Sequence, residues 1–301
     1  YANHGVNMIP FYIYYSMFGF QRIGDYLWAA GDMQARGFLL GGTAGRTTLA
    51  GEGLQHQDGH SLLAASTIPN CVAYDPTYSY ELAVIIQDGL RRMYQQRENI
   101  FYYLTCMNEN YAHPAMPQGV EAGILKGMYL LKSQGQTKTK VTLMGAGTIL
   151  REVEAAAVIL EQEFKISSDI YSCPSFSELR RDALEVERWN LLHPSEKPRE
   201  NYVTQTLAQS TGPYIAASDY MKVVADQIRQ WVPGRYVVLG TDGYGRSDGR
   251  AALRQHFEVD KHYIVAATLK SLVDEGKLDQ KSVQAYIAKH IDANKPSPAS
   301  L

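Results

Sequence analysis

The segment Met8-Ile-Pro-Phe-Tyr-Ile-Tyr-Tyr-Ser-Met-Phe18 decides how the chain folds. It is short, rich in aromatic side chains, and apolar at both odd and even positions. A strand that is covered on both faces of a parallel sheet has this pattern. We therefore predict a buried parallel strand here, with helices packed on either side of its sheet.

The next hundred residues alternate between segments with the pattern of a buried strand and segments with helical periodicity. The alternation predicts an α/β domain, because strands joined by helices form parallel sheets. The predicted strands are 38–42, 71–74 and 100–105, and the predicted helices or helical turns are 21–36, 61–67 and 78–94.

The second half of the chain repeats this alternation after a segment rich in proline and polar residues, so we predict two open, three-layer α/β domains. We assign residues 1–118 to the first domain, 119–139 to a linker with a helix over 120–131, and 140–301 to the second domain. In the second domain the predicted strands are 141–144, 170–172, 214–217 and 236–240, and the predicted helices are 152–164, 178–191, 220–231 and 262–290.

Composition excludes several classes of partner. The 301 residues carry 29 basic and 31 acidic side chains, a net charge of −2, which gives no basic field for nucleic acid or an anionic membrane. The apolar runs are much shorter than the roughly 18 residues of a membrane span. Three scattered cysteines predict a reducing compartment, the cytoplasm. The chain opens without methionine or a signal peptide pattern and enters a strand within a dozen residues, so we expect a piece of a longer protein.

The segment from Gly41 to His60 is the strongest candidate for a functional site. It holds six glycines, two histidines, Glu52, Asp58 and Arg46, directly after a predicted strand. Ligand sites of open α/β sheets lie at the carboxyl ends of the strands, whereas a long loop without function is uncommon in a compact domain. We therefore favour a functional loop over a flexible surface loop.

Of three kinds of chemistry that could occur at this loop, its residues favour one. The spacing of His56 and His60 resembles a zinc-binding helix, but Gln57 stands where that motif has glutamate, and Gly59 weakens a helix. The glycines match neither of the common nucleotide-binding motifs. Histidine titrates near neutral pH, so we predict general acid chemistry or hydrogen bonding by the imidazoles, with Glu52 and Asp58 tuning them.

A second candidate is the aromatic cluster at the end of the first predicted strand. Most of its rings are best explained as core, but Tyr15 and Phe18 lie nearest the strand's carboxyl end and could stack on a flat heterocycle. Arg22 could contact an anionic group. The turn-rich segment 242–248 follows the last predicted strand of the second domain, and we interpret it as structural.

Three blocks together resemble one family. They are residues 10–22, residues 51–61, and residues 239–248 followed by 256–260. The chain resembles the homodimeric type of pyruvate dehydrogenase decarboxylating component, a thiamin diphosphate enzyme of the transketolase superfamily, from Asn7 to about Ile291. The resemblance implies three α/β domains. This chain would supply the last two, the pyrimidine-binding domain and the transketolase-like carboxy-terminal domain.

The resemblance also implies that two requirements for activity lie outside this sequence. One is the first domain, which binds magnesium and the diphosphate. The other is a glutamate upstream of Tyr1 that protonates the aminopyrimidine ring. The expected reaction is the decarboxylation of pyruvate followed by acetyl transfer to the lipoyl domain of dihydrolipoyl acetyltransferase. A homodimer is expected, with the site shared between two chains.

Carried over by motif, Tyr15 and Phe18 would stack around the aminopyrimidine, with Arg22 nearby. His56 would stabilise or protonate the developing oxyanion, Glu52 would support it, and His60 is a weaker catalytic candidate. No metal ligand is expected in this chain. Two alternatives stay open: an enzyme of the transketolase type acting on sugar phosphates, for which only Arg46 is a candidate phosphate ligand, and an inactive chain that folds and dimerises.

Overall fold

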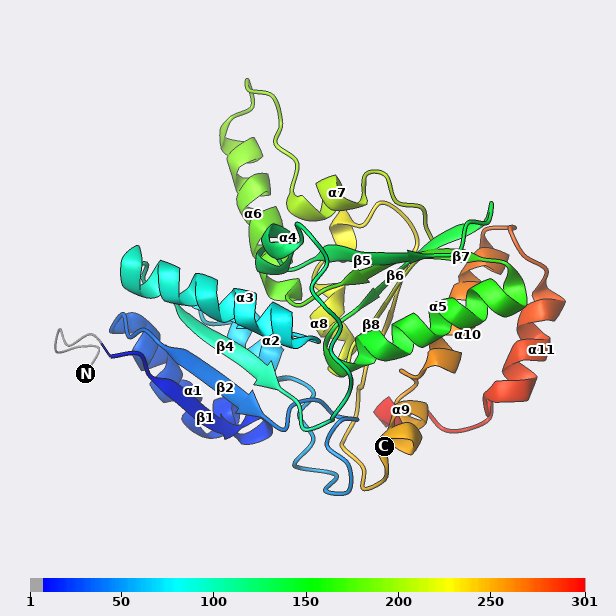
Figure 1. The fold of residues 1–301 in the computed structure, drawn as a ribbon, viewed down its shortest axis with the longest axis horizontal. Helices are drawn as coiled ribbons and strands as arrows, with labels where there is room; N and C mark the ends of the chain where they lie inside the picture. The colour runs from blue at the N-terminus through cyan, green and yellow to red at the C-terminus, as the bar shows by residue number, and fades with distance from the viewer. Residues whose placement is uncertain (1–7, 301) are drawn as a thin grey trace.

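The computed structural model describes residues 8–300, so the first seven residues of the predicted first domain lie outside the described residues. It contains two sheets, one in each half of the chain, and helices pack against both (Figure 1). The two α/β units that the sequence predicts are therefore confirmed. Among the described residues no helix is both long and apolar enough to cross a bilayer.

The first sheet is parallel and has the strand order β1-β2-β4-β3. Its strands are β1 (Phe11–Tyr15), β2 (Phe38–Gly42), β3 (Cys71–Tyr74) and β4 (Phe101–Cys106). The helices of this half are α1 (Ser16–Asp32), α2 (Ser61–Ser66), α3 (Ser79–Leu90), which continues as a π-helical turn over Arg91–Gln95, and α4 (Glu121–Lys126).

The position of β1 corrects one prediction. The segment is a parallel strand as predicted, but it is the edge of the sheet, and its side chains are exposed: 47% for Phe11, 54% for Tyr12 and 70% for Ile13. The apolar pattern correctly indicated a strand, but only part of it is covered: Tyr14 packs against Phe20 and Tyr103, whereas the three side chains before it stay largely exposed. The strand also ends at Tyr15, and α1 begins at Ser16 rather than at Gln21.

The second sheet has the order β5-β7-β6-β8-β9, in which only β5 is antiparallel. Its strands are β5 (Tyr129–Gln134), β6 (Lys140–Gly145), β7 (Ser167–Ser172), β8 (Tyr214–Ala217) and β9 (Tyr236–Leu239). The helices are α5 (Leu150–Phe164), α6 (Phe176–Leu192), α7 (Tyr202–Leu207), α8 (Lys222–Asp226), α9 (Arg250–His256), α10 (Lys261–Asp274) and α11 (Gln280–His290).

The predicted linker is more structured than the sequence suggested. The helix expected over 120–131 ends at Lys126, because Gly127 adopts a left-handed conformation with φ of +99°. Residues after it form β5, which pairs with β7 and is the edge of the second sheet. Part of the 119–139 segment therefore belongs to the second sheet.

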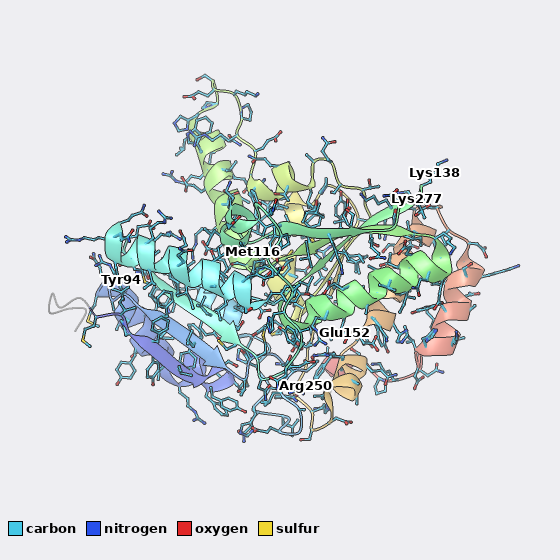
Figure 2. All side chains as sticks on the ribbon, in the orientation of Figure 1. Tyr94, Met116, Lys138, Glu152, Arg250 and Lys277 are labelled. Atoms are coloured by element: carbon cyan, nitrogen blue, oxygen red, sulfur yellow. The ribbon has the colours of Figure 1, made fainter. Side chains whose placement is uncertain are left out.

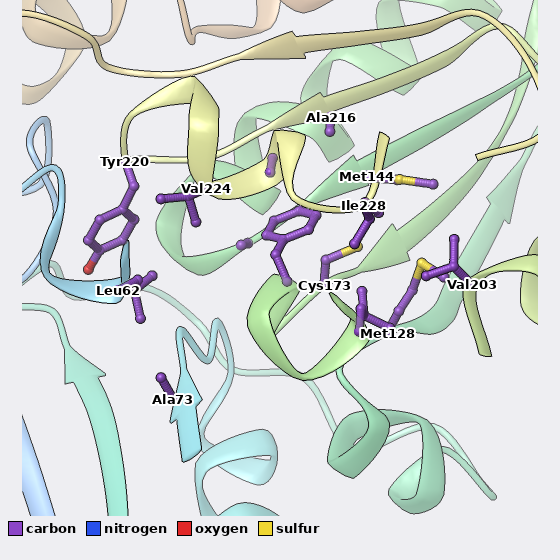
Figure 3. Close-up of a cluster of buried hydrophobic side chains, with 14 of the residues drawn as sticks. Leu62, Ala73, Met128, Met144, Cys173, Val203, Ala216, Tyr220, Val224 and Ile228 are labelled. Carbon is purple, nitrogen blue, oxygen red and sulfur yellow. The ribbon is translucent and has the colours of Figure 1, made fainter. Parts of the chain in front are cut away.

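The two halves share one hydrophobic core. Leu62 and Ala73 of the first half pack in the same cluster as Tyr220 and Val224 of the second (Figure 3). A buried carboxylate adds polar links: Glu81, at the start of α3, accepts hydrogen bonds from the hydroxyls of Tyr129 and Ser172, both at 2.6 Å. Side chains of both halves are thus fixed against one another.

Candidate functional site

The predicted site residues meet where β1 and β2 end. Neighbouring parallel strands β1 and β2 bring their carboxyl ends together, so the first turn of α1 faces the loop that follows β2. Tyr15 ends β1, Phe18 lies in the first turn of α1, and the loop carries Glu52 and His56.

An aromatic and imidazole cluster forms at this point. The His56 ring stands edge-to-face against Tyr15 and Phe18, with ring centroids 5.8 and 5.3 Å apart, and the Tyr15 and Phe18 rings are themselves 5.3 Å apart. All three side chains are partly exposed. The cluster therefore presents aromatic surface and an imidazole to the same side of the loop.

Polar groups surround this cluster. The Tyr15 hydroxyl donates a hydrogen bond of 2.8 Å to Glu52, whose carboxylate lies 4.0 Å from Nε2 of His56. Partial burial, and then the hydrogen bond to Glu52, raise the pKa of Tyr15, so its hydroxyl remains a donor at neutral pH. The Arg22 guanidinium lies 4.1 Å from the centre of the Phe18 ring.

His60 occupies a different position from His56. It lies at the start of α2, where its Nε2 is 3.0 Å from the Gln21 amide nitrogen. Because an amide N–H only donates, Nε2 of His60 acts as the acceptor. The buried carboxylate of Asp58 accepts hydrogen bonds from the backbone N–H groups of His60 and Ser61, at 3.0 and 2.9 Å. Asp58 thus holds the backbone turn and does not contact the His56 ring.

Arg46 does not act as an exposed anion ligand. It is 4% exposed, and its guanidinium donates to the carbonyl oxygens of Thr241 and Gly243 in the second half of the chain. The sequence offered this arginine as a phosphate ligand. In the structure, Nη1 of this arginine donates to both backbone carbonyls.

Sequence reasoning missed the contribution of residues 242–248 to this site. In Figure 1 the blue loop between β2 and α2 lies beside the yellow-orange segment that follows β9. The side chain of Gln57 accepts a hydrogen bond of 2.7 Å from the backbone N–H of Arg246. The glycines of both segments were the available signal, since close backbone approach favours glycine.

Buried charges also join the halves close to the loop. Glu109, which follows β4, accepts hydrogen bonds from Arg151 at 2.9 Å and from Arg254. Arg254 is also 3.3 Å from Glu152, and Arg250 donates to the carbonyl of Thr48 within the loop. Figure 2 shows Glu152 and Arg250 at this junction. Burial alone would raise the pKa of Glu109, but its hydrogen bonds and the arginine charges hold it below the usual value.

Two family descriptions match the chain. Residues 1–114 match the pyruvate dehydrogenase E1 component middle domain, and residues 127–260 match the transketolase-like TK carboxy-terminal domain. The chain is 61% identical to a pyruvate dehydrogenase E1 component of Pseudomonas aeruginosa and 57% identical to one of Escherichia coli K12, in each case over 99% of its own length. It spans 34% of the length of these relatives.

Solved structures share the fold at low sequence identity. A transketolase from Campylobacter jejuni superimposes with a TM-score of 0.66 at 17% identity, over 87% of this chain and 36% of that one. An inactive β4 tetramer of a split-gene transketolase superimposes with a TM-score of 0.60 at 16% identity, over 90% of this chain and 80% of that one. These likenesses establish a transketolase-like α/β fold.

Proposed function

The chain belongs to the pyruvate dehydrogenase E1 family, and on that premise we propose that it supplies one half of a thiamin diphosphate site that decarboxylates pyruvate. In this proposal the acetyl group passes to the lipoyl domain of dihydrolipoyl acetyltransferase. The observation that carries the proposal is the cluster of Tyr15, Phe18 and His56, with Glu52 bonded to Tyr15.

The residues fit one end of the cofactor. Partly exposed aromatic rings beside a carboxylate and an imidazole can pack against and hydrogen-bond a flat polar heterocycle such as an aminopyrimidine. Among residues 8–300 there is no cluster of three histidine, cysteine or acidic side chains placed to hold a metal ion. We propose, from the family resemblance, that Mg²⁺ and the diphosphate bind a domain that precedes this portion.

The cofactor, when bound, supplies the carbon nucleophile and the electron sink. The residues of this chain bind and orient the cofactor and the substrate. The rings of Tyr15 and Phe18 position the pyrimidine and keep water from that side, and Arg22 stacks on Phe18. His56 donates a hydrogen bond or a proton to the substrate oxygen on which negative charge develops. Glu52 fixes Tyr15 through its hydroxyl, and we give His60 no step.

We propose that the chain works as part of a homodimer and is inactive alone. The open, apolar edge of β1 supports association with a second copy, because edge strands with exposed apolar side chains pair readily with other chains. The tetrameric assembly of the split-gene transketolase supports self-association of this fold. The molar mass of the purified chain in solution tests this, and a strict monomer would contradict it. Three unpaired cysteines support a cytoplasmic location.

The reaction is tested with an E1 enzyme that carries this chain as its carboxy-terminal portion. Pyruvate is offered with a lipoyl domain, and separately with an artificial electron acceptor, while xylulose 5-phosphate and ribose 5-phosphate are offered in parallel. We expect carbon dioxide release and an acetylated lipoyl domain from pyruvate, with negligible turnover of the sugar phosphates. Turnover of sugar phosphates alone would favour the transketolase alternative, and the absence of any turnover would oppose both.

A further inference from the structure

The loop that carries His56 is built largely on the second half of the chain. At its beginning, the carboxylate of buried Asp219, which follows β8, accepts the backbone N–H of Thr47 at 2.8 Å and the hydroxyl of Thr48 at 2.7 Å. Arg46 adds its bonds to the carbonyls of Thr241 and Gly243. The first stretch of the loop is therefore fixed to the ends of β8 and β9.

A second set of contacts fixes the loop on either side of His56. The backbone N–H of Gly51 donates to the carbonyl of Asp248 at 3.0 Å, and that of Met221 donates to the carbonyl of Gly59 at 2.8 Å. Between them, the fully buried Gln57 donates to the carbonyl of Leu49 and accepts from the N–H of Arg246, both at 2.7 Å.

Close approach of the two backbones reinforces this arrangement. A Cβ atom at Gly245 would lie 2.8 Å from the Gln57 side-chain oxygen and 2.9 Å from the carbonyl oxygen of Leu54. Gly53 has φ of +69°, and a Cβ there would meet Ser247. The two backbones therefore approach more closely than side chains at these two positions would allow.

His56 lies between these anchors, adjacent to Gln57 and three residues after Gly53. Its side chain makes ring contacts with Tyr15 and Phe18 and approaches Glu52 at 4.0 Å, and its backbone N–H donates to the carbonyl of Gly53 at 2.9 Å. These contacts leave the backbone of the loop to determine where the imidazole stands. We infer that residues 242–248 of the second half position His56, with Gln57 as the positioning residue that joins them to the loop.

The placement of His56 by residues 242–248 is a property of the folded chain. The expected effect of that placement on the reaction rate rests on the proposed function. The second half of the chain then contributes to the reaction by positioning His56, although it supplies no catalytic residue. A misplacement of about 1 Å can cost about 10²-fold in rate. A loose loop should therefore lower kcat while leaving the folded protein intact.

The test uses two variants that disturb the same contact from opposite sides, Gln57→Leu in the loop and Gly245→Ala in the second half. The controls are Gln55→Leu, an exposed neighbour in the loop, and Gly249→Ala, where a Cβ meets nothing within 4 Å. In the chain itself, the ¹⁵N and ¹H signals of the His56 imidazole and amide hydrogen exchange over 51–58 are measured, after circular dichroism establishes folding.

We expect both variants to shift or broaden the His56 signals and to speed exchange over 51–58 by about tenfold or more, while both controls match the wild type. In the E1 enzyme we expect kcat to fall by about 10- to 100-fold with little change in KM for pyruvate. Unchanged His56 signals in a folded Gln57→Leu variant would overturn the inference, even if Gly245→Ala failed to fold. An inactive wild type with shifted His56 signals in the variants would refute the proposed function and retain the positioning.

Discussion

Replacing His56 by alanine in the E1 enzyme is expected to lower the rate of pyruvate decarboxylation by about 10²- to 10⁴-fold, the range that a positioned acid or base contributes. The imidazole is the titratable donor that lies against both aromatic rings of the cluster. Its loss leaves the developing oxyanion without that partner. Stability should change little, because the ring is partly exposed and is not part of the shared core.

Decarboxylation with an artificial acceptor and acetyl transfer to the lipoyl domain are assayed separately, so that the affected step can be identified. His193→Ala is the matched control, since its ring stacks on Trp189 at the end of α6, away from the loop. If both reactions keep their wild-type rates in His56→Ala, the role assigned to this imidazole is wrong.

Replacing Arg254 by alanine is expected to cost about 1–3 kcal/mol in the free energy of unfolding, because the largely buried carboxylate of Glu109 then keeps Arg151 as its only hydrogen-bonding arginine. The Arg254 side chain is 7% exposed and Glu109 is 11% exposed, so water replaces the lost contact poorly. Denaturant unfolding gives the value. Arg188→Ala removes an exposed arginine 3.9 Å from Glu185 and should change stability by no more than about 0.5 kcal/mol.

The contact between Arg254 and Glu109 also predicts that the free energy of unfolding depends on pH. The arginines hold the pKa of Glu109 in the folded chain below its value in the unfolded chain, near 4.3. A group with a depressed folded pKa stabilises the fold fully above the unfolded pKa, and this stabilisation is lost as pH falls through the folded pKa. Wild type should therefore lose stability below about pH 4.3 more steeply than Arg254→Ala. Parallel pH profiles of the two proteins would contradict this account of Glu109.

Local sequence patterns were sufficient for most of the fold. Strands such as β3 and β4 are largely apolar and aromatic runs, and their burial follows from that pattern. Only the family resemblance placed Tyr15 and Phe18 in one site with Glu52 and His56, and in the structure they meet because the ends of adjacent parallel strands converge. Strand β5 was missed because its polar residues, such as Lys132 and Ser133, resemble a linker.

Other features depend on contacts that no local pattern records. The exposure of Ile13 depends on which strand lies at the edge of the sheet, and hydropathy does not contain that order. Arg46 reads as a surface cation in sequence, but its partners Thr241 and Gly243 lie almost 200 positions away. The support of the His56 loop by residues 242–248 is hidden for the same reason.

We propose that Tyr15 and Phe18 hold the aminopyrimidine ring, with His56 beside them facing the substrate. The most direct measurement is calorimetric titration of thiamin diphosphate, with Mg²⁺ present, into E1 enzyme carrying either wild-type chain or Phe18→Ala. Tyr26→Ala, an exposed aromatic on the same helix, is the control. We expect Phe18→Ala to weaken binding by about 5- to 150-fold, from the roughly 1–3 kcal/mol of one base-like stack, while Tyr26→Ala binds as the wild type does. Equal affinity of all three proteins would contradict it.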